Sequence, residues 1–340
     1  MFAQLTDTLN LLSKLSFRKV INVFLILKTY YLSKYSKKLI QSGLPISLAF
    51  EPTTTCNLKC PQCPSGLRQF SRPTGKAETA IFEKLVDEVS PTLLYLTLYF
   101  QGEPYLHPQF LDLVNYAHQN KIYTATSTNA HYLTDENAKK TVESGLDRII
   151  ISLDGTTQES YQKYRLGGKL EKVIKGIETL VHWKKKLKSK TPYIIVQFIV
   201  FKHNQNELKV VKRLAKKLKV DKLALKTAQI YDYEQDTALI PSEGKYARYQ
   251  KNKDGKFEIK NNLLNSCWRM WSSCVITWDG KVVPCCFDKD ASKQFGNLVQ
   301  NDFKAIWSNP NYDDFRTKLL KSRKEIDICK NCSEGTKVWL

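Results

Sequence analysis

Three cysteines lie within eight residues near the start of the chain, in the stretch EPTTTCNLKCPQCPSG at 51–66. They are Cys56, Cys60 and Cys63, and no further cysteine occurs before Cys267. Thiolates without a neighbouring histidine suit zinc or an iron–sulfur cluster. A structural zinc site normally closes with a fourth protein ligand, whereas a cubane cluster held by three cysteines leaves one iron open. We interpret the missing fourth cysteine as an open coordination position.

The segments around this loop alternate between strand-like and helix-like patterns from residue 46 to about 230. Six tandem βα units predict a parallel sheet with right-handed crossovers. We expect an α/β fold, a partial (β/α)6 TIM-like barrel, with a doubly wound open sheet as the alternative. The predicted strands are apolar on both faces, as buried parallel strands are. They are ISLAFEP (46–52), YLTLYF (95–100), YTATSTN (123–129), RIIISLDG (148–155), YIIVQFIVFK (193–202) and KLALKTAQI (222–230), with helices at 80–90, 171–187 and 206–218.

Polar side chains follow the ends of these predicted strands. The cysteine loop follows the first strand, and Gly102-Glu103-Pro104 follows the second. Ser127 ends the third strand, and Ser152 and Asp154 end the fourth. Sites in such barrels form at the carboxyl ends of the strands, so we expect these groups to meet at one rim.

The C-x3-C-x2-C loop after the first strand of a βα domain resembles the radical S-adenosylmethionine (radical SAM) superfamily, over about residues 46–230. The resemblance implies that Cys56, Cys60 and Cys63 hold a 4Fe–4S cluster whose open iron binds SAM through its amino and carboxylate groups. It also implies reductive cleavage of SAM to a 5′-deoxyadenosyl radical, which abstracts hydrogen from a substrate. One position departs from the family: an aromatic residue often precedes the third cysteine, and this chain has Gln62.

The same resemblance assigns contacts to SAM. The segment Gly102-Glu103-Pro104 resembles the family's GGE segment, whose backbone and carboxylate receive the SAM ammonium group. Ser152 resembles the residue that bonds the SAM ribose, and Arg165 the arginine that pairs with the SAM carboxylate. Ser127 and Asp154 are further candidates for SAM contacts because of their places at strand ends. The alternatives are a turn for 102–104, an N-cap or turn for Ser152 and Asp154, and a solvated surface for Arg165.

Two polar residues inside the later strands, Gln197 and Lys226, are candidates to touch substrate, or they are satisfied polar groups of the barrel. The sequence singles out no catalytic acid or base, because too many titratable residues qualify.

The last 74 residues carry the other six cysteines and resemble a SPASM or twitch domain, the auxiliary-cluster module of many radical SAM enzymes. The resemblance implies one auxiliary 4Fe–4S cluster. Zinc held by two cysteine pairs is the alternative. Asp-Gly in WDGKVV (278–283) predicts the turn of a hairpin. The matching pieces are Trp278-Asp279-Gly280, Pro284-Cys285-Cys286, Gly296-Asn297, Ile306-Trp307 and Cys329-x2-Cys332, and the implied ligands are Cys267, Cys285, Cys329 and Cys332, with Cys274 or Cys286 as substitutes.

The pattern divides the chain into a basic amphipathic helical segment (1–44), a radical SAM core (45–262) and an auxiliary-cluster domain (263–340). Residues 14–38 combine an apolar run, Val20–Leu27, with flanking lysines and arginine. The run is too short to cross a bilayer, which needs roughly 20 residues. Such a helix can lie on an anionic membrane surface or dock on the protein's own core, and both interpretations stay open.

Composition limits the compartment and the partners. Nine cysteines are too few for a disulfide scaffold, and the start of the chain lacks a signal-peptide pattern. We therefore expect a cytoplasmic protein, with a peripheral place at the inner face of the membrane as a variant of this prediction. The net charge of +20 favours anionic partners. Lysine runs such as 183–190 lack interleaved aromatics and fit solvated helix faces, so an RNA-modifying enzyme ranks behind other functions.

These observations predict a radical SAM oxidoreductase that modifies a small molecule, anionic or lipid-linked, while the auxiliary cluster accepts or relays an electron. A peptide-modifying maturase is the alternative, although the segment of about 45 residues before the first strand is shorter than that family's peptide-recognition domain. The expected partners are the substrate and a one-electron reductant such as flavodoxin or ferredoxin.

Overall fold

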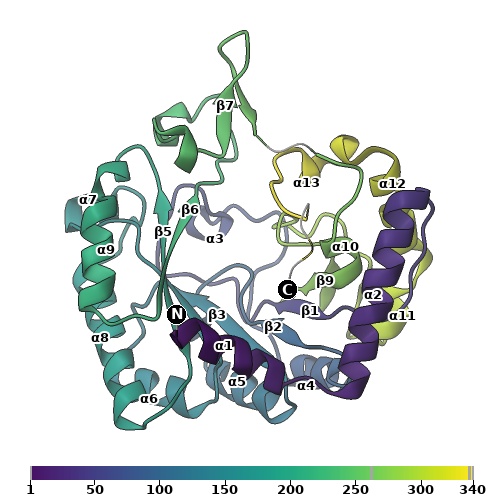
Figure 1. Ribbon diagram of the computed structural model, residues 1–340, viewed down its shortest axis with the longest axis horizontal. Helices are drawn as coiled ribbons and strands as arrows, with labels where there is room; N and C mark the ends of the chain where they lie inside the picture. The colour runs from purple at the N-terminus through teal and green to yellow at the C-terminus, as the bar shows by residue number, and fades with distance from the viewer. Residues whose placement is uncertain (1, 261–262, 336–337, 339–340) are drawn as a thin grey trace. The chain divides into compact units, whose positions relative to one another are not determined.

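The computed structural model describes residues 2–260, 263–335 and 338, and it forms two compact units (Figure 1). The first, called here the loop unit, comprises residues 2–7, 56–69 and the described residues from 126 to 260. The second, the C-terminal unit, comprises residues 8–55, 70–125 and the described residues beyond 262. The predicted boundary at residue 262 lies outside the described residues. The mixed α/β class with a parallel sheet is confirmed.

Strand β1 organises the sheet of the C-terminal unit. It pairs in parallel with β2, and β2 pairs in parallel with the first half of β3. On its other side β1 pairs in parallel with β9, which continues through an antiparallel hairpin into β10 and then β11. The strands are β1 (Ser47–Phe50), β2 (Tyr95–Thr97), β3 (Tyr123–Thr128), β9 (Ser273–Ile276), β10 (Lys281–Val283) and β11 (Gly296–Asn297). The hairpin was predicted, but its place beside β1 was not.

Helices α4 and α5 belong to the same unit as these strands. Apolar residues recur in α4 at Phe82, Leu85, Val86 and Val89, which is the spacing of one buried helix face. The Phe82 ring packs edge-on against Phe50 of β1, with centroids 4.9 Å apart. The helices of this unit are α2 (Phe17–Ser36), α4 (Thr79–Val89), α5 (Phe110–Gln119), α10 (Arg269–Ser272), α11 (Phe303–Trp307), α12 (Pro310–Ser322) and α13 (Asp327–Lys330), and α1 (Phe2–Ser13) has residues in both units.

The loop unit carries the parallel strands β4, β5 and β6, with the longer helices alongside them (Figure 1). The first six strands of the structure, β1 to β6, each lie within one of the six segments predicted as strands. Most residues of the three predicted helices are likewise helical. The elements are α3 (Pro64–Leu67), α6 (Asp135–Glu143), β4 (Arg148–Ser152), α7 (Gln158–Gln162), α8 (Leu170–Lys186), β5 (Tyr193–Val200), α9 (Leu208–Lys217), β6 (Lys222–Thr227), β7 (Tyr249–Lys251) and β8 (Phe257–Ile259).

The segment after β6 contains the β7–β8 hairpin and contributes to a hydrophobic core. Ile240, Ala247 and Tyr249 are buried in one cluster with Leu58 and Cys60 of the cysteine loop. The Tyr249 hydroxyl fixes this packing, since it donates to Ile230 O at 3.0 Å and accepts from Ile230 N at 2.9 Å. The apolar residues are too widely spaced to give a periodic signal, which is why the sequence did not reveal this core.

A buried ion pair fixes the carboxyl end of β1. Glu51 accepts from Arg72 through both oxygens, at 2.6 and 2.8 Å, and both side chains are almost fully buried. The Glu51 carboxylate also accepts from Trp278 N at 3.2 Å, in the turn of the β9–β10 hairpin. Burial raises the pKa of Glu51 while Arg72 opposes that shift. This carboxylate thus joins the end of β1 to the hairpin.

Replacing Glu51 by glutamine should lower the free energy of unfolding of the iron-free protein by about 3–5 kcal/mol, because Arg72 would stay buried without its counter-charge. Urea denaturation measures this loss. The matched control is Glu136→Gln, whose ion pair with Lys140 is exposed, so its loss should leave the free energy of unfolding almost unchanged. The double variant Glu51→Gln/Arg72→Met should lose less than Glu51→Gln alone. Equal losses for the two single glutamine variants would show that the pair is not what holds this strand end.

Candidate functional site

The cysteine loop is held from three sides within the loop unit. Cys60 is buried in the hydrophobic cluster, and Cys56 and Cys63 are half-buried against it. Lys59 N donates to Leu166 O at 2.9 Å, which ties the loop to the segment after α7. Helix α3 follows Cys63 at once and packs so closely that a Cβ on Gly66 would lie 2.5 Å from Cys60 N. The three thiols therefore lie on one short, fixed loop.

Nitrogen donors face two of these sulfurs. Arg165 Nη1 lies 3.8 Å from Cys60 Sγ, and Asn129 Nδ2 lies 4.0 Å from Cys56 Sγ. Leu58 N donates to Cys56 Sγ at 3.5 Å. Burial raises the pKa of the Cys60 thiol, and the Arg165 charge works against that rise. Such donors favour sulfur that carries negative charge, as a thiolate bound to iron does.

Arg165 is oriented by Asp154, another predicted site residue. Arg165 Nε and Nη2 each lie 2.6 Å from Asp154 Oδ2, and the carboxylate is fully buried. Asp154 Oδ1 accepts from Ile199 N at 2.7 Å. The nearby carboxylate keeps the pKa of Arg165 above its ordinary value, despite burial. Since both oxygens of Asp154 are engaged, the structure places it as a positioning residue for Arg165.

The other predicted polar residues of this unit lie on or near the strands. Ser152 of β4 is buried and stands opposite Gln197 of β5 in the parallel register. Lys226 of β6 stands opposite Ile199 of β5, one residue pair from the strand end. Ser127 is half-buried in the last part of β3. The structure thus puts Ser152 and Gln197 side by side.

Gln62, where the family often has an aromatic residue, bonds the segment that follows β6. Its Oε1 accepts from Tyr231 N at 2.9 Å, and its Nε2 donates to Asp236 Oδ2 at 2.8 Å. Burial and the neighbouring Cys63 raise the pKa of Tyr231. Tyr231 therefore brings an aromatic side chain to the cysteine loop. The sequence missed it because Tyr231 lies 168 positions after Cys63.

In the C-terminal unit, the segment Gly102-Glu103-Pro104 lies against the end of β1. Gly102 has a φ of +75°, and a Cβ there would overlap the Thr53 carbonyl, so only glycine fits. Glu103 N donates to Thr55 O at 2.8 Å, one residue before Cys56. The Glu103 side chain is buried, with Oε1 3.4 Å from Tyr105 N. The segment after the second predicted strand thus packs against the backbone of Thr53 and Thr55, within the same unit.

The four predicted auxiliary ligands line one pocket of the C-terminal unit. Cys267 precedes α10, Cys285 follows β10, and Cys329 and Cys332 come from α13 and the turn after it. Burial raises the pKa of the Cys332 thiol to about 12, and it also raises the pKa of the Cys285 thiol well above its ordinary value. The remaining wall is formed by Arg269, Met270, Phe287, Phe315, Leu319, Arg323 and Ile328. The structure therefore brings these four thiols together.

The two substitutes named from sequence lie elsewhere. Cys274 is buried on β9, and burial raises the pKa of its thiol, while Arg316 and Tyr312 oppose that rise. Cys286 is half-buried and packs against the cluster of Phe100, Val275 and Val283. Neither lines the pocket of the four cysteines.

Two arginines and a glycine complete this pocket, and the sequence analysis missed all three. Arg323 is buried, donates from Nη2 to Cys332 Sγ at 3.3 Å, and is held by the carbonyls of Ser266 and Glu334. Arg269 pairs with the Glu334 carboxylate at 3.3 Å, and nearby Cys286 and Glu334 keep its pKa above the ordinary value. The turn after Cys332 ends at Gly335, whose φ is +76°. A Cβ on Gly335 would overlap the Cys267 sulfur.

The donor sets provide the thiolate ligands that iron–sulfur clusters use. Among the described residues, no three histidine, cysteine or acidic side chains are gathered as a mononuclear site requires. A cubane places each thiolate on a different iron, so its ligands need not converge on one point. Thiols with arginine and amide donors pointing at them provide the sulfur ligands and the counter-charge that such a cluster needs.

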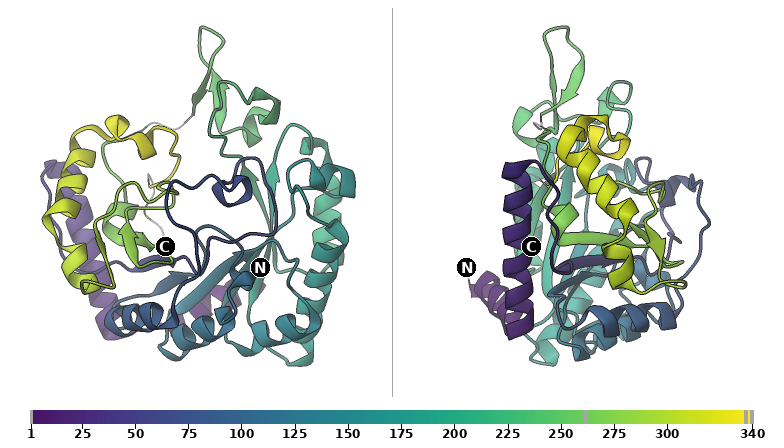
Figure 2. Two further views of the ribbon diagram at one scale, coloured as in Figure 1. Left: turned by 180° about the vertical axis from the view of Figure 1, so that it is seen from behind. Right: turned by 90° about the vertical axis from the view of Figure 1, so that its right-hand side faces the viewer.

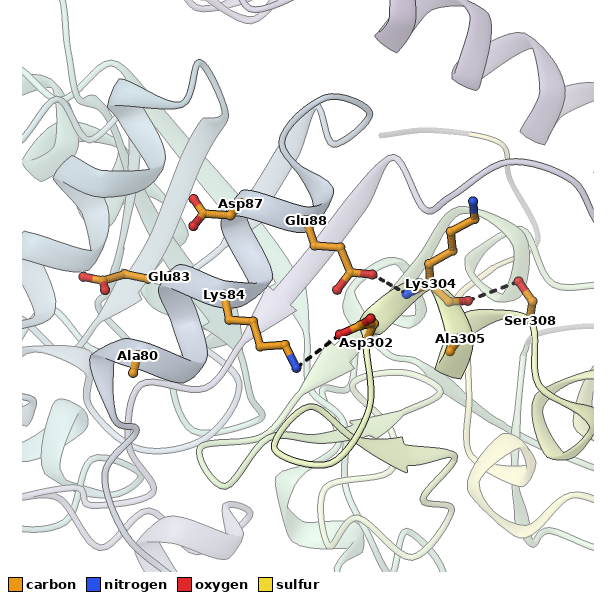
Figure 3. Close-up of a pocket in the computed structure, with 9 residues that line it drawn as sticks. All are labelled: Ala80, Glu83, Lys84, Asp87, Glu88, Asp302, Lys304, Ala305 and Ser308. Carbon is orange, nitrogen blue, oxygen red and sulfur yellow. Dashed lines mark hydrogen bonds and ion pairs between the residues drawn. The ribbon is translucent and has the colours of Figure 1, made fainter.

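A broad surface pocket of the C-terminal unit lies along α4 and the start of α11 (Figure 3). Glu88 of this pocket caps α11, because its carboxylate accepts hydrogen bonds from Phe303 N at 2.8 Å and from Lys304 N at 2.6 Å. Lys84 pairs with Asp302 at 3.3 Å on the same wall. None of the predicted site residues lines this pocket, and we give it no catalytic role.

Comparison with known proteins identifies the class. A model of the radical SAM superfamily matches residues 50–220, and the SPASM model, an iron–sulfur cluster-binding domain, matches residues 267–333. The fold and the thiol sets thus define an iron–sulfur enzyme that uses SAM to modify a substrate. The chain belongs to the radical SAM superfamily and carries a C-terminal SPASM domain.

The proteins similar to this chain have names that describe action on different substrates. The chain is 27% identical over 314 residues to a tungsten-containing aldehyde ferredoxin oxidoreductase cofactor-modifying protein of Pyrococcus furiosus, covering 84% of this chain and 86% of the relative. It is 24% identical over 302 residues to an AdoMet-dependent heme synthase of Methanosarcina barkeri, covering 79% and 83%. Streptococcus suis SuiB, solved with its precursor peptide SuiA, superposes with a TM-score of 0.61 at 16% identity, covering 91% of this chain and 74% of SuiB. The last likeness shows the fold alone.

Replacing Arg165 by methionine should weaken SAM binding at least about tenfold, because a charge-assisted pair with the SAM carboxylate would be lost. Calorimetric titration of the reconstituted protein with SAM measures this, alongside its iron content. Lys163→Met is the matched control, since the Lys163 side chain is exposed on the same segment. Equal SAM affinity in wild type and Arg165→Met would remove Arg165 from the binding site.

Replacing Gly335 by alanine should cost the auxiliary cluster, leaving about 4 of about 8 iron atoms, because the added Cβ would displace the Cys267 sulfur. Iron and sulfide analysis after anaerobic reconstitution measures the loss. Gly244→Ala is the control, since a Cβ there meets only the flexible end of Lys260, at 3.6 Å. Full iron in Gly335→Ala would show that the turn after Cys332 does not border the cluster.

Proposed function

We propose that this radical SAM enzyme holds two 4Fe–4S clusters and oxidises its substrate by two electrons. Cys56, Cys60 and Cys63 hold the cluster that is open to SAM. Cys267, Cys285, Cys329 and Cys332 hold an auxiliary cluster with no open iron. The observation that carries the proposal is that these four cysteines line one pocket into which Arg323 donates.

When bound, the SAM-binding cluster supplies the electron that cleaves SAM to methionine and a 5′-deoxyadenosyl radical. The residues of the chain position the SAM molecule. Arg165, oriented by Asp154, pairs with the SAM carboxylate, and Glu103 with the Gly102 backbone receives its ammonium group. Ser152 bonds the ribose, and Tyr231 offers its ring to the adenine in place of the aromatic residue that Gln62 replaces. Ser127 adds a polar contact at the end of β3.

A bound auxiliary cluster would supply an acceptor for one electron of the substrate, in addition to the hydrogen atom that the radical would remove and the proton that a base would take. Two electrons and two hydrogens thus leave the substrate, as in oxidation of an alcohol to a carbonyl. Arg323 and Arg269 support the electron-accepting role. Arg323 places a positive charge beside the thiolates, and Arg269, which is paired with Glu334, lies on the same wall. These guanidinium groups would stabilise the added negative charge of a reduced cluster.

A small molecule is the substrate class that we favour. The names of the two curated relatives describe action on a cofactor and formation of heme, and both chains are covered over most of their length. The net charge of +20 adds a preference for an anionic or lipid-linked molecule. A peptide substrate is the second candidate, because SuiB was solved with a precursor peptide. Thermal shift with SAM and sugar phosphates or acidic lipids, against peptides, separates the two.

The proposal includes a one-electron reductant, such as a flavodoxin or ferredoxin, because the SAM-binding cluster must be reduced before each cleavage. It also includes a cytoplasmic location with peripheral contact to the membrane. In the described residues, no helix combines the length and apolar character that crossing a bilayer demands.

Iron analysis combined with SAM cleavage tests the two-cluster proposal. After anaerobic reconstitution the wild type should hold about 8 iron atoms and release 5′-deoxyadenosine with dithionite. The variant with Cys56, Cys60 and Cys63 all changed to alanine should hold about 4 and release none. Changing Cys267, Cys285, Cys329 and Cys332 should also leave about 4, but with SAM cleavage retained. A wild type with about 4 iron atoms would remove the auxiliary acceptor, and zinc in both sites would overturn the radical mechanism.

A further inference from the structure

Helix α2 turns its polar side inward and its apolar side outward. The inward residues are Lys19, Asn22, Ile26, Thr29, Tyr30 and Ser33. Four of these six, all except Ile26 and Tyr30, have polar or charged side chains without an aromatic ring. Surface helices of globular proteins normally bury an apolar stripe and expose a polar face. The arrangement of α2 is the reverse, so something other than the protein's own core accounts for its apolar residues.

Hydrogen bonds and aromatic contacts within the C-terminal unit fix this orientation. Asn22 bonds the backbone of Leu44 twice, donating to its O at 2.7 Å and accepting from its N at 2.9 Å. Ser33 does the same with Ile40, at 2.9 Å in each direction. The Tyr30 ring packs edge-on against Trp268, with centroids 5.2 Å apart. Rotating α2 to bury its apolar face would break all of these contacts.

The outward face of α2 is a stripe of large apolar side chains, interrupted by Lys28. Phe17 is 81% exposed, Phe24 69% and Tyr35 75%, and the spacing of i, i+7 and i+18 puts them on one line along the helix. Figures 1 and 2 show α2 as a long helix at the edge of its unit. The other large exposed apolar residues of this helix are Val20, Ile21, Leu25, Tyr31 and Leu32.

The charges around the stripe have one sign. Residues 8–50 contain seven lysines and arginines and no aspartate or glutamate. Lys28 lies within the stripe, Arg18 and Lys34 lie on α2 at its sides, and Lys37 and Lys38 follow the helix. Lys34 Nζ lies 6.0 and 5.8 Å from the ring centres of Tyr31 and Tyr35. An aromatic stripe rimmed by lysine matches a layer with a negative surface and an apolar interior.

We propose that the outward face of α2, comprising Phe17, Ile21, Phe24, Lys28, Tyr31 and Tyr35, binds the surface of a bilayer that contains anionic lipids. The aromatic rings enter the boundary between headgroups and acyl chains, and the lysines pair with phosphates. The helix lies on the surface rather than spanning it. A second copy of the chain fits this face poorly, because the basic rims would face each other. The proposal concerns attachment, and it holds whatever the substrate is.

Vesicle flotation with the full-length reconstituted protein tests this surface. Wild type should float with vesicles of phosphatidylglycerol and phosphatidylcholine and stay behind with phosphatidylcholine alone. Phe17→Ser/Phe24→Ser/Tyr35→Ser should bind the anionic vesicles at least about tenfold more weakly. Lys28→Glu/Lys34→Glu should bind about tenfold more weakly too, and the wild-type binding should fall with added salt. Val210→Ser/Val299→Ser, changed at exposed apolar residues outside α2, should match wild type.

Circular dichroism and iron content establish that each variant is folded, since the changed side chains are exposed except for that of Lys34, which is half-buried. Flotation of neither wild type nor variants, or equal flotation of all of them, overturns the proposal. A wild-type dimer in light scattering that the triple serine variant converts to monomer, without vesicle binding, would reassign the face to self-association. Saturable binding to polyglutamate without flotation would reassign it to an acidic protein. Failure of SAM cleavage leaves the flotation result intact, so the two proposals fail separately.

Discussion

The carboxylate of Glu51 holds together the parts of the C-terminal unit that lead to its chemistry. Glu51 directly follows β1. Its carboxylate accepts hydrogen bonds from both terminal nitrogens of a buried arginine and from the backbone N–H of Trp278 in the hairpin turn. The chain leaves β1 toward the cysteine loop, and the hairpin leads to Cys285. One buried charge therefore fixes the places where two cysteine-bearing segments start. Arg72 supplies the counter-charge that a carboxylate removed from water requires.

Each of the two thiol sets has a buried arginine, but the two arginines are held differently. Arg165, beside Cys60, is paired with the Asp154 carboxylate, so the charge it presents to sulfur is largely balanced. Arg323, beside Cys332, is held by the carbonyls of Ser266 and Glu334, which leave its positive charge in place. The first arrangement suits orientation of a ligand carboxylate. The second suits stabilisation of an added electron.

Local patterns in the sequence predicted most of the fold and the position of the cysteine loop. The β-branched strands and the spacing of Phe82, Leu85 and Val89 depend on neighbours a few residues away, so they were predictable. The C-x3-C-x2-C loop and the Asp279-Gly280 turn are equally local. Arg323, Arg269 and Gly335 gain their roles only when distant segments meet, and an isolated arginine or glycine in sequence carries no sign of a sulfur beside it. The same holds for Tyr231, which reaches the cysteine loop through Gln62.

The parallel pairing of β1 with β9 has a consequence for how the protein is made. Ser47 is paired with Ser273, so β1 waits for a partner that is synthesised 226 residues later. At translation rates of about 5–20 residues per second, that delay lasts roughly 10–45 s. During this time one edge of β1 is an open template for pairing with other chains. Nascent chains of this enzyme therefore pass through an aggregation-prone stage that ends only when the cysteine-rich segment emerges from the ribosome.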